Sequence, residues 1–284
     1  MSTTDHHPSR PLQDRTALIT GGSRGIGAAT AVRLAELGAR VVITYRQAEA
    51  EAEAVVERCF GLTPRASAVQ MDLLEEDSVR AAFGSLELDR LDFLIANAAA
   101  TALKPLLALK MHQVDKTFAI SVRHFLLMVQ LAYPLLEKAG GRIIAVSGAD
   151  TVGYIPSHGL LAAAKAAMET LVYYLACELG PAGVTTMGIL PGFVDTDSIR
   201  MMTGPVYGHI KEGEVESHPF REAATPDQVA EAISLLCLDE ARWLNGQVVR
   251  CDGGGLFAMT GRYYDALIRS RGVEPPPDAP IVGI

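Results

Sequence analysis

Short runs of β-branched and apolar residues alternate with longer Ala- and Leu-rich segments from residue 16 onward. The short runs have the length of buried strands. They are residues 16–20, 40–45, 66–71, 91–96, 141–147, 183–189 and 247–251. The longer segments predict helices. They lie near 25–38, 48–60, 75–88, 106–138, 155–179 and 226–239. The alternation is typical of repeated βαβ units, so we expect an α/β fold: a single Rossmann-type domain with a doubly wound, parallel, seven-stranded sheet.

Three segments do not fit this alternation. Residues 1–14 are polar, and we expect a disordered leader before a domain that spans 15–257. Residues 191–222 form the longest stretch without a clear assignment, which predicts a loop over the substrate. Residues 258–284 begin with a short helical pattern and end in a Pro-rich tail.

The acidic balance of the chain argues against two classes of partner. With 284 residues, a net charge of -8 and a pI near 5.4, the chain has no basic surface that would attract nucleic acid or an anionic membrane. No apolar run approaches the ~20 residues of a membrane span, and residues 1–14 contain no signal peptide. We therefore expect a soluble cytoplasmic protein that acts on a small molecule.

Cysteine and histidine spacing predicts no metal site. The cysteines stand at positions 59, 177, 237 and 251, without the paired spacing of zinc ligands or a disulfide framework. They suit a reducing cytoplasm. His6 and His7 belong to the polar leader, and we interpret them as part of a flexible end.

A glycine-rich turn separates the first predicted strand from the first predicted helix. It reads TGGSRGIG, residues 20–27. Gly21, Gly25 and Gly27 permit a tight turn and bring backbone N–H groups close to a pyrophosphate. The sequence therefore predicts a dinucleotide site, and the other residues expected to contact the cofactor in this turn are Ser23, Arg24 and Ile26.

The end of the second predicted strand indicates which dinucleotide binds. An acidic residue there would bond the ribose 2′-hydroxyl of NAD and repel a 2′-phosphate. The sequence has Thr44 and Arg46 instead. Arg46 and Arg24 can clamp a phosphate through charge-assisted hydrogen bonds, so we expect NADP(H) as the cofactor.

Several ordered motifs resemble the short-chain dehydrogenase/reductase family over about residues 12–257. They are TGGSRGIG, ANAAA (96–100), Lys165, LPGFVDT (190–196) and GQVVRCDGG (246–254). The resemblance implies further contacts with the adenine, the ribose and the nicotinamide. The residues implied are Asp72 and Leu73 for the adenine, Asn97 and Ala98 for the ribose, and Pro191, Gly192, Val194 and Thr196 for the nicotinamide.

The same resemblance implies a catalytic serine, tyrosine, lysine and asparagine, and most of them are replaced here. In the family, the lysine lowers the pKa of the tyrosine and holds the ribose, while the tyrosine passes a proton to the reduced oxygen. Alignment through Lys165 puts Leu161 at the tyrosine, Gly148 at the serine and Ser121 at the asparagine. The active site is therefore expected to be atypical.

Two residues near Lys165 are candidates for the missing proton donor. His158 precedes Lys165 by seven residues, which is close to two helical turns, so we expect both on one helix face. The family's enoyl-thioester reductases carry their tyrosine at this spacing, and the segment is similar to theirs. Histidine can donate a proton near neutral pH. Tyr154, on the preceding loop, is the second candidate, although its ring can equally form an apolar wall.

Two functional hypotheses follow from these replacements. The first is an NADPH-dependent oxidoreductase that reduces a conjugated carbonyl, enoyl or ketone substrate. The second is a non-redox protein on the same fold: an isomerase, dehydratase, cyclase or nucleotide-binding pseudoenzyme.

Two predicted helices also indicate self-association. Residues 122–136 and 167–179 are apolar on nearly all sides. The resemblance implies that such helices pack between subunits, so we expect a homodimer or homotetramer.

Overall fold

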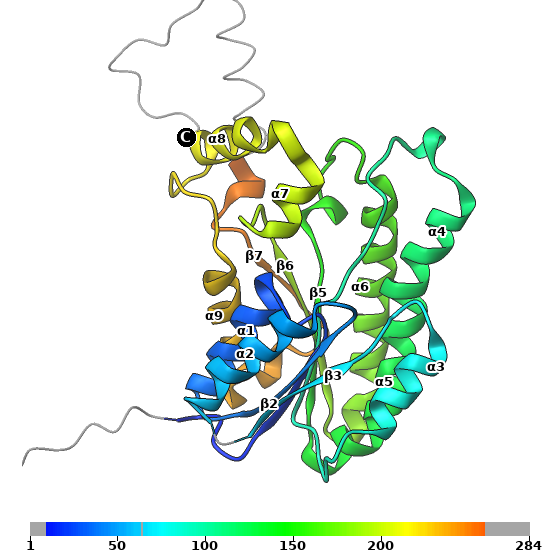
Figure 1. Cartoon of the computed structure of the whole chain (residues 1–284), viewed down its shortest axis with the longest axis vertical. Helices are drawn as coiled ribbons and strands as arrows, with labels where there is room; N and C mark the ends of the chain where they lie inside the picture. Colours follow the sequence, from blue (N-terminus) through cyan, green and yellow to red (C-terminus); the bar gives the residue numbers. More distant parts are fainter. Residues whose placement is uncertain (1–9, 64, 259–284) are drawn as a thin grey trace, which may run out of the picture.

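A parallel sheet of seven strands forms the centre of the computed structural model, which describes residues 10–63 and 65–258 (Figure 1). The strand order is β3-β2-β1-β4-β5-β6-β7. The strands are β1 (Thr16–Ile19), β2 (Arg40–Tyr45), β3 (Ala66–Gln70), β4 (Phe93–Ala96), β5 (Arg142–Val146), β6 (Thr185–Pro191) and β7 (Val248–Cys251). This is the doubly wound Rossmann-type sheet that the sequence predicts.

Burial on both faces explains why the central strands are apolar without alternation. Every residue of β1, β4, β5 and β6 is buried. Parallel strands covered by helices on both sides have this composition. The chain runs outward from β1 to β3 and then returns to place β4 on the other side of β1. The strand order therefore reverses between β1 and β4, where ligands bind in such sheets.

Helices cover the sheet in two layers (Figure 1). One layer contains α1 (Gly25–Glu36), α2 (Glu49–Phe60) and α9 (Pro226–Leu236), and the other contains α3 (Glu76–Gly84), α5 (His124–Ala139) and α6 (Gly159–Leu179). Small residues at the buried positions of α1, such as Ala28, Ala31 and Ala35, let it pack closely against the sheet. Larger side chains, including Phe125 and Leu136 of α5, fill the core on the opposite face.

The apolar segment 106–138 is not the continuous helix that its pattern predicts. It contains a short 3-10 turn, η1 (Leu106–Ala108), followed by α4 (Met111–Phe118), a π-helical turn, η2 (Ala119–Arg123), and α5. The wider π turn buries both Ile120 and Ser121. Apolar residues continue through the break, so the sequence pattern gave no sign of it. Such π turns are frequent near functional sites.

Helix α6 begins later than predicted. Its first residue is Gly159 rather than residue 155, and Ser157 has a left-handed φ of 67°, which interrupts a helix. His158 is therefore the N-cap of α6. A 3-10 turn, η3 (Ala149–Thr151), precedes it. The prediction that His158 and Lys165 lie on one face of the same helix is therefore wrong: His158 caps α6, and Lys165 lies within it.

The segment 191–222 is largely helical, contrary to the predicted loop. It contains α7 (Asp197–Thr203), the 3-10 turn η5 (Gly204–Val206) and α8 (Tyr207–Ser217), which lie over the end of the sheet in Figure 1. Neither α7 nor α8 has a buried residue. A helix without a buried stripe has little apolar periodicity, which explains why the sequence pattern missed both.

The ordered domain begins before residue 15. Residues 11–14 form a turn, and the side chain of Leu12 is 2% exposed within the core beside α1. The Leu12 N–H donates to the Leu37 carbonyl over 3.0 Å, which anchors this turn. The predicted leader, residues 1–14, therefore wrongly includes residues 11–14, which belong to the folded domain. Residues 1–9 and the tail from 259 onward lie outside the described residues.

Two helical stretches pass a simple test for a membrane span, although we expected no apolar run of that length. Met111–Ala139 and Gly159–Ala182 have mean hydropathies of 1.4 and 1.3, enough by length and composition to cross a membrane. Both contribute buried side chains to the core against the sheet, which accounts for their composition. This burial makes them weak indications of a membrane span.

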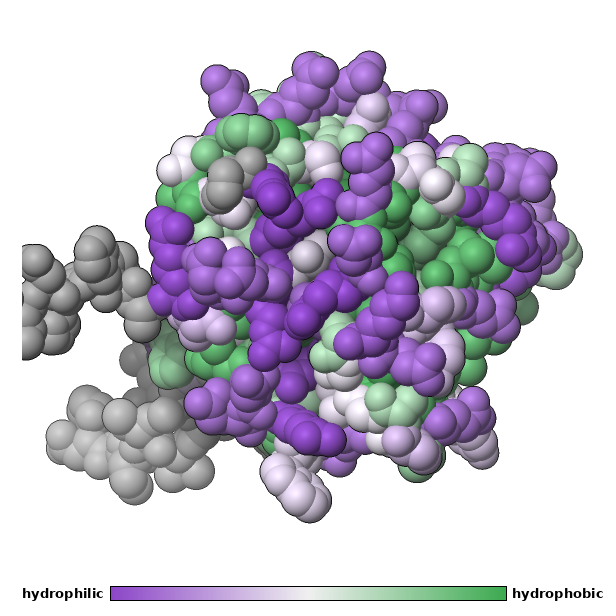
Figure 2. All heavy atoms as spheres, turned by 90° about the horizontal axis from the view of Figure 1, so that it is seen from below, coloured by the Kyte–Doolittle hydropathy of each residue, from purple (hydrophilic) through white to green (hydrophobic). Residues whose placement is uncertain are grey.

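The amino ends of the strands carry a polar network that is separate from the carboxyl ends. Asp92, before β4, accepts hydrogen bonds from the Thr16 N–H over 2.9 Å and from Arg15 Nη1 over 3.1 Å. Arg142 donates to Thr185 Oγ1 over 3.1 Å. Hydrophilic side chains cover much of this face (Figure 2). We interpret this end as structural, because ligands bind at the carboxyl ends of such strands.

Candidate active site

The loops after β1 and β4 are tied together at the point where the strand order reverses. Thr20 is fully buried, and its hydroxyl accepts hydrogen bonds from the N–H groups of Asn97 and Ala98, both over 3.0 Å. The Asn97 amide in turn donates to the carbonyls of Thr20 and Gly21 over 3.0 and 3.3 Å. Asn97 and Ala98 thus lie beside the glycine-rich turn.

The backbone geometry of that turn requires glycine. Gly21 and Gly25 have left-handed φ angles of 66° and 56°, and a Cβ on Gly27 would lie 2.3 Å from the Gly21 carbonyl oxygen. Arg24 is the N-cap of α1, and its side chain makes no capping hydrogen bond. The first N–H groups of a helix have no partner within the helix, so they are available to an anion.

The end of β2 closes the other side of the turn. Thr44 is buried, and its carbonyl and hydroxyl accept hydrogen bonds from the N–H groups of Gly22 and Gly21 over 2.9 and 3.4 Å. Arg46 follows as an exposed side chain, as does Arg24 from the turn. Thr44 therefore has a structural role here, and the two arginines remain accessible to a phosphate.

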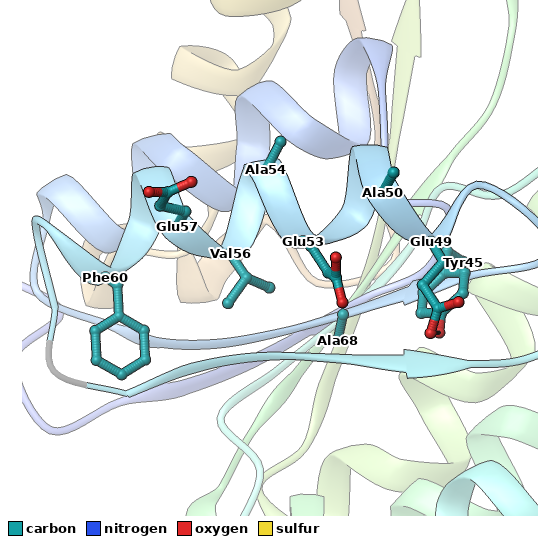
Figure 3. A pocket seen from close by; sticks show the side chains of 9 residues that line it. All are labelled: Tyr45, Glu49, Ala50, Glu53, Ala54, Val56, Glu57, Phe60 and Ala68. Atoms are coloured by element: carbon teal, nitrogen blue, oxygen red, sulfur yellow. Dashed lines mark hydrogen bonds between the residues drawn. The ribbon is translucent and has the colours of Figure 1, made fainter.

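A separate groove lies along the outer edge of this region, between α2 and β3 (Figure 3). Glu49, Glu53 and Glu57 line it together with apolar side chains such as Phe60, and Glu49 accepts a hydrogen bond from the Tyr45 hydroxyl over 3.1 Å. A row of carboxylates repels a phosphate. This groove is therefore unsuited to a dinucleotide.

The loop after β3 is held in place by its own polar groups. The Asp72 N–H donates to Ser78 Oγ over 2.9 Å, and its carboxylate accepts the Leu74 N–H over 2.9 Å. Leu73 is buried, and its carbonyl is hydrogen-bonded to the ring Nδ1 of His124. These bonds fix Asp72 and Leu73 at the carboxyl edge of the sheet, where the resemblance implies the adenine.

The segment after β6 approaches the glycine-rich turn from above. A Cβ on Gly25 would lie 3.7 Å from Thr196 Cγ2, which places the two segments in contact. Thr196 caps α7 by accepting the Ile199 N–H over 3.3 Å. Pro191 and Val194 are buried, and a Cβ on Gly192 would meet the Asp252 side chain at 3.0 Å. The structure thus brings together the residues that the resemblance assigns to the nicotinamide end.

Asp195, which the sequence analysis missed, anchors the two helices above the site. Its carboxylate accepts hydrogen bonds from Lys211 Nζ over 2.6 Å, the Tyr207 hydroxyl over 2.5 Å and Arg200 Nη2 over 2.8 Å. The bonds from Lys211 and Tyr207 hold the pKa of the Asp195 carboxyl far below its usual range. The only feature of the sequence that could have identified Asp195 is its place directly before Thr196 in the LPGFVDT motif.

Lys165 is buried beneath the end of β5. Lys165 is 5% exposed, and its Nζ donates a hydrogen bond to the Val146 carbonyl over 2.6 Å. Burial lowers the pKa of Lys165 from 10.5 to about 8, while the charges of Asp150 and Glu169 act in the opposite direction. The ammonium group is therefore fixed at the strand end, close to the predicted catalytic segment.

His158 pairs with an acidic residue that the sequence analysis did not select. Its Nδ1 lies 3.4 Å from Asp150 Oδ2, and the His158 side chain is 27% exposed against 4% for Asp150. Asp150 is the single acidic residue between Val146 and Lys165, a signal that could have identified it. The structure thus groups His158, Asp150 and Lys165 after β5.

The other residues considered for catalysis in the sequence analysis make no side-chain hydrogen bond with His158, Asp150 or Lys165 within the described residues. Tyr154 is 85% exposed and makes no hydrogen bond within the described residues, so no polar contact holds it to Lys165. Ser147 donates to Glu169, which also accepts from Thr151 Oγ1 over 2.9 Å. Ser121 Oγ is buried without a hydrogen-bond partner in residues 10–63 and 65–258. Leu161 is half-buried and offers only apolar contact.

The cradle fits a nicotinamide dinucleotide. The first N–H groups of α1 have no side-chain cap and lie at the glycine-rich turn. The glycines leave room for the close approach of a ligand, and the Lys165 ammonium group provides a positive charge at the end of β5. Among the described residues, no group of three or more His, Cys, Asp or Glu side chains could hold a metal ion.

Comparison with known proteins gives concordant results. A family model described as Enoyl-(Acyl carrier protein) reductase matches residues 21–255. A 1-cyclohexenylcarbonyl-CoA reductase of Streptomyces collinus is 33% identical, over 90% of this chain and 94% of its own length. A hydroxynaphthalene reductase-like protein of Metarhizium acridum is 30% identical, over 90% and 100%.

A solved structure extends this likeness to three dimensions. The angucycline C-6 ketoreductase LanV, crystallised with bound NADP, superposes with a TM-score of 0.81 at 30% identity. The match covers 89% of this chain and 99% of that protein. The likeness therefore spans the cofactor cradle and the segment that carries His158 and Lys165.

The buried Lys165 predicts a pH-dependent stability. Because its pKa falls from 10.5 to about 8 on folding, the unfolded chain holds more protons between these values. The free energy of unfolding should therefore rise with pH through this window. Lys165→Met removes the effect. Between about pH 7 and pH 10, we expect the wild type to gain about 2–3 kcal/mol relative to this variant.

Urea unfolding of both proteins without cofactor, at both pH values, measures this difference. Titrating cysteines and tyrosines are common to the two proteins, so their contributions cancel. An equal pH dependence in wild type and Lys165→Met would show that Lys165 titrates normally in the folded chain.

Proposed function

The chain belongs to the short-chain dehydrogenase/reductase family, and we propose that it is an NADPH-dependent reductase of a cyclic, conjugated carbonyl compound. The observation that carries the proposal is the grouping of His158 and Lys165 at the strand end that adjoins the dinucleotide cradle. A histidine and a buried ammonium group at this strand end support the proposal, because ligands bind at the carboxyl ends of the strands in this fold.

NADP(H) is favoured over NAD(H) by the charges at the end of β2. Arg46 and Arg24 are exposed cations, while Tyr45 and Thr44 leave no carboxylate at the strand end itself. A related ketoreductase has been crystallised with NADP. Helix α1 would hold the pyrophosphate, and Lys165 would hold the ribose of the nicotinamide. When bound, NADPH supplies a hydride to the substrate carbon.

Relatives and the apolar mouth of the site both favour a cyclic substrate. The relatives include proteins named for cyclohexenyl, hydroxynaphthalene and angucycline substrates, all of which contain rings. Leu106 lies against the start of α6, since its side chain would meet a Cβ on Gly159 at 2.9 Å. Leu106 and Tyr154 are 63% and 85% exposed. Such exposed apolar groups near a catalytic segment suit an apolar ring.

A conjugated carbonyl suits a site without the family's tyrosine. Hydride addition to the β-carbon of an enone produces an enolate, which needs a hydrogen bond more than immediate full protonation. Doubly protonated His158 can provide that bond from Nε2, because Nδ1 faces Asp150. Lys165, close by, adds a positive charge that favours the negative oxygen. Leu161 leaves an apolar wall where the tyrosine would stand.

The reaction and the role of His158 can be tested together. NADPH absorbance should fall on mixing the protein with cyclic enones or aryl ketones, and His158→Ala should lower turnover by ~10²-fold or more. NADPH affinity should change little, because His158 is not among the residues expected to contact the cofactor. Tyr154→Phe, which removes only a solvent-exposed hydroxyl, is the matched control and should keep near-normal turnover.

Three other outcomes have distinct meanings. An active His158→Ala with an inactive Tyr154→Phe would identify Tyr154 as the donor. Activity in both variants would assign the proton to water or to the substrate. Tight NADPH binding without turnover of any ketone or enone would favour the non-redox hypothesis of an isomerase, dehydratase, cyclase or pseudoenzyme.

Cofactor preference provides an independent prediction. Because Arg46 follows β2 in place of an acid, NADPH should bind at least about tenfold more tightly than NADH, a difference of ~1.4 kcal/mol. Arg46→Asp should abolish or reverse this preference by repelling the 2′-phosphate. Fluorescence titration of both cofactors measures the two dissociation constants. Equal affinities in the wild type would contradict the assignment.

We further propose a homodimer or homotetramer that packs through α5 and α6. The outer side of α6 exposes Tyr173, Tyr174 and Cys177. Figure 2 shows hydrophobic surface toward the side on which Figure 1 draws α5 and α6. A patch of this kind is rarely left in water. The free cysteines support the proposal that the protein works in a reducing cytoplasm on a small molecule, without nucleic acid or membrane.

Light scattering at micromolar concentration should give a mass two or four times that of the 30.3 kDa chain. Tyr174→Glu, which puts a charge on this outer side, should shift the protein toward smaller species. Its matched control, Trp243→Glu, alters a residue that is 96% exposed near the amino ends of the strands and should have no effect. A monomeric wild type would exclude the assembly.

A further inference from the structure

We propose that Asp150 occupies the place of the family's catalytic serine and is the positioning residue that orients His158 for proton donation. This inference rests on the proposed function of His158. It extends that function, because it explains how the chain can lack both the serine and the tyrosine and still hold a proton donor, His158, in a fixed orientation toward the substrate oxygen.

The space for Asp150 comes from Gly148. A Cβ on Gly148 would lie 2.7 Å from Asp150 Oδ1, closer than real Cβ atoms approach a neighbour. Gly148 aligns with the serine that the family resemblance implies, and its φ of -157° is accessible to any residue. Gly148 therefore leaves the room in which Asp150 Oδ1 lies: with a serine at this position, the Asp150 carboxylate would have to shift from its observed place.

Asp150 has the surroundings of a functional carboxylate. Its side chain is 4% exposed, and Oδ1 has no hydrogen-bond partner in the part of the chain that the structure describes. A buried carboxylate is costly unless a positive charge or a donor faces it. The titratable groups near it are His158 across from η3, and Lys165 and Glu169 from α6. His158 and Lys165 are the ones that can carry compensating positive charge.

The contact with Asp150 determines which nitrogen of His158 is free. Nδ1 lies 3.4 Å from Oδ2, a separation that a small ring rotation would turn into a normal N–H···O bond. A carboxylate only accepts hydrogen bonds, so Nδ1 carries the hydrogen. Nε2 then points away from Asp150, and in the doubly protonated ring it is the atom that donates to a substrate oxygen, as in other His–Asp pairs.

The proton and electron balance is simple. Bound NADPH would supply the hydride: its C–H bond would break, the new C–H bond would form on the substrate carbon, and the π electrons of the conjugated carbonyl would move to the oxygen. The N–H bond at Nε2 of doubly protonated His158 breaks as that oxygen takes its proton. His158 is left neutral with its hydrogen on Nδ1, still bonded to Asp150. A solvent proton then restores Nε2–H. The net change consumes NADPH and one proton and releases NADP⁺ and the reduced product.

Nitrogen NMR of the full-length protein with ¹⁵N-labelled histidine tests the orientation without relying on activity. His158→Gln identifies the signals of His158 among those of the other histidines. In the wild type at neutral-imidazole pH, we expect hydrogen on Nδ1 and a bare Nε2. Asp150→Ala should shift His158 toward the Nε2–H form, while Asp150→Glu should restore part of the Nδ1–H population.

Kinetics provide the second measurement. Asp150→Ala should lower kcat by at least about 10-fold while the NADPH dissociation constant stays within about 2-fold. Adding Asp150→Ala to His158→Ala should cause no further loss, because the two residues act as one unit. Asp89→Asn, on an exposed loop before β4, is the matched control for loss of a carboxylate and should match the wild type.

A second variant keeps the test decisive if Asp150→Ala does not fold. Gly148→Ala puts a methyl group 2.7 Å from Asp150 Oδ1 and should displace the carboxylate, with the same change of tautomer and kcat. The proposal is overturned if His158 keeps Nδ1–H in Asp150→Ala or Gly148→Ala, or if both variants retain wild-type kcat. An active His158→Ala would instead refute the proposed donor, and the NMR result would still decide whether Asp150 orients the ring.

Discussion

The contact between the loops that follow β1 and β4 is the constraint on which the site depends. A single buried hydroxyl, that of Thr20, accepts two backbone N–H groups from the β4 loop, and Asn97 returns two hydrogen bonds to the β1 loop. Buried polar groups of this kind leave little freedom, because each lost bond would leave an unsatisfied group. The glycine-rich turn is thereby fixed against the sheet, with its helix N-terminus directed at the place of a pyrophosphate.

Burial of charge defines the second half of the site. Lys165 is held by the Val146 carbonyl in surroundings that lower its pKa to about 8, and Asp150 and Glu169 supply the opposing charges. Glu169 accepts hydrogen bonds from Ser147 and Thr151, whereas Asp150 Oδ1 has no hydrogen-bond partner among residues 10–63 and 65–258. The asymmetry separates a carboxylate that stabilises the fold from one that is free to act on His158.

The helices above the site depend on a different kind of interaction. Because α7 and α8 bury no side chain, apolar packing contributes little to their position, and the bonds of Asp195 with Arg200, Tyr207 and Lys211 tie them to the end of β6. Segments with few buried contacts open at low free-energy cost. A firm cradle and a loosely held cover suit an enzyme that binds its cofactor in a fixed pose and admits a substrate of variable shape.

The sequence by itself determined the doubly wound parallel sheet and the dinucleotide cradle. Buried parallel strands and a glycine-rich turn leave local patterns of apolar residues and glycines that can be recognised along the chain. It also selected His158 and Lys165, by their separation. Only the tertiary structure decided the start of α6 at Gly159, the helices within 191–222 and the pairing of Asp150 with His158. These depend on a left-handed residue, on polar contacts and on the space beside Gly148, none of which leaves a periodic trace in the sequence.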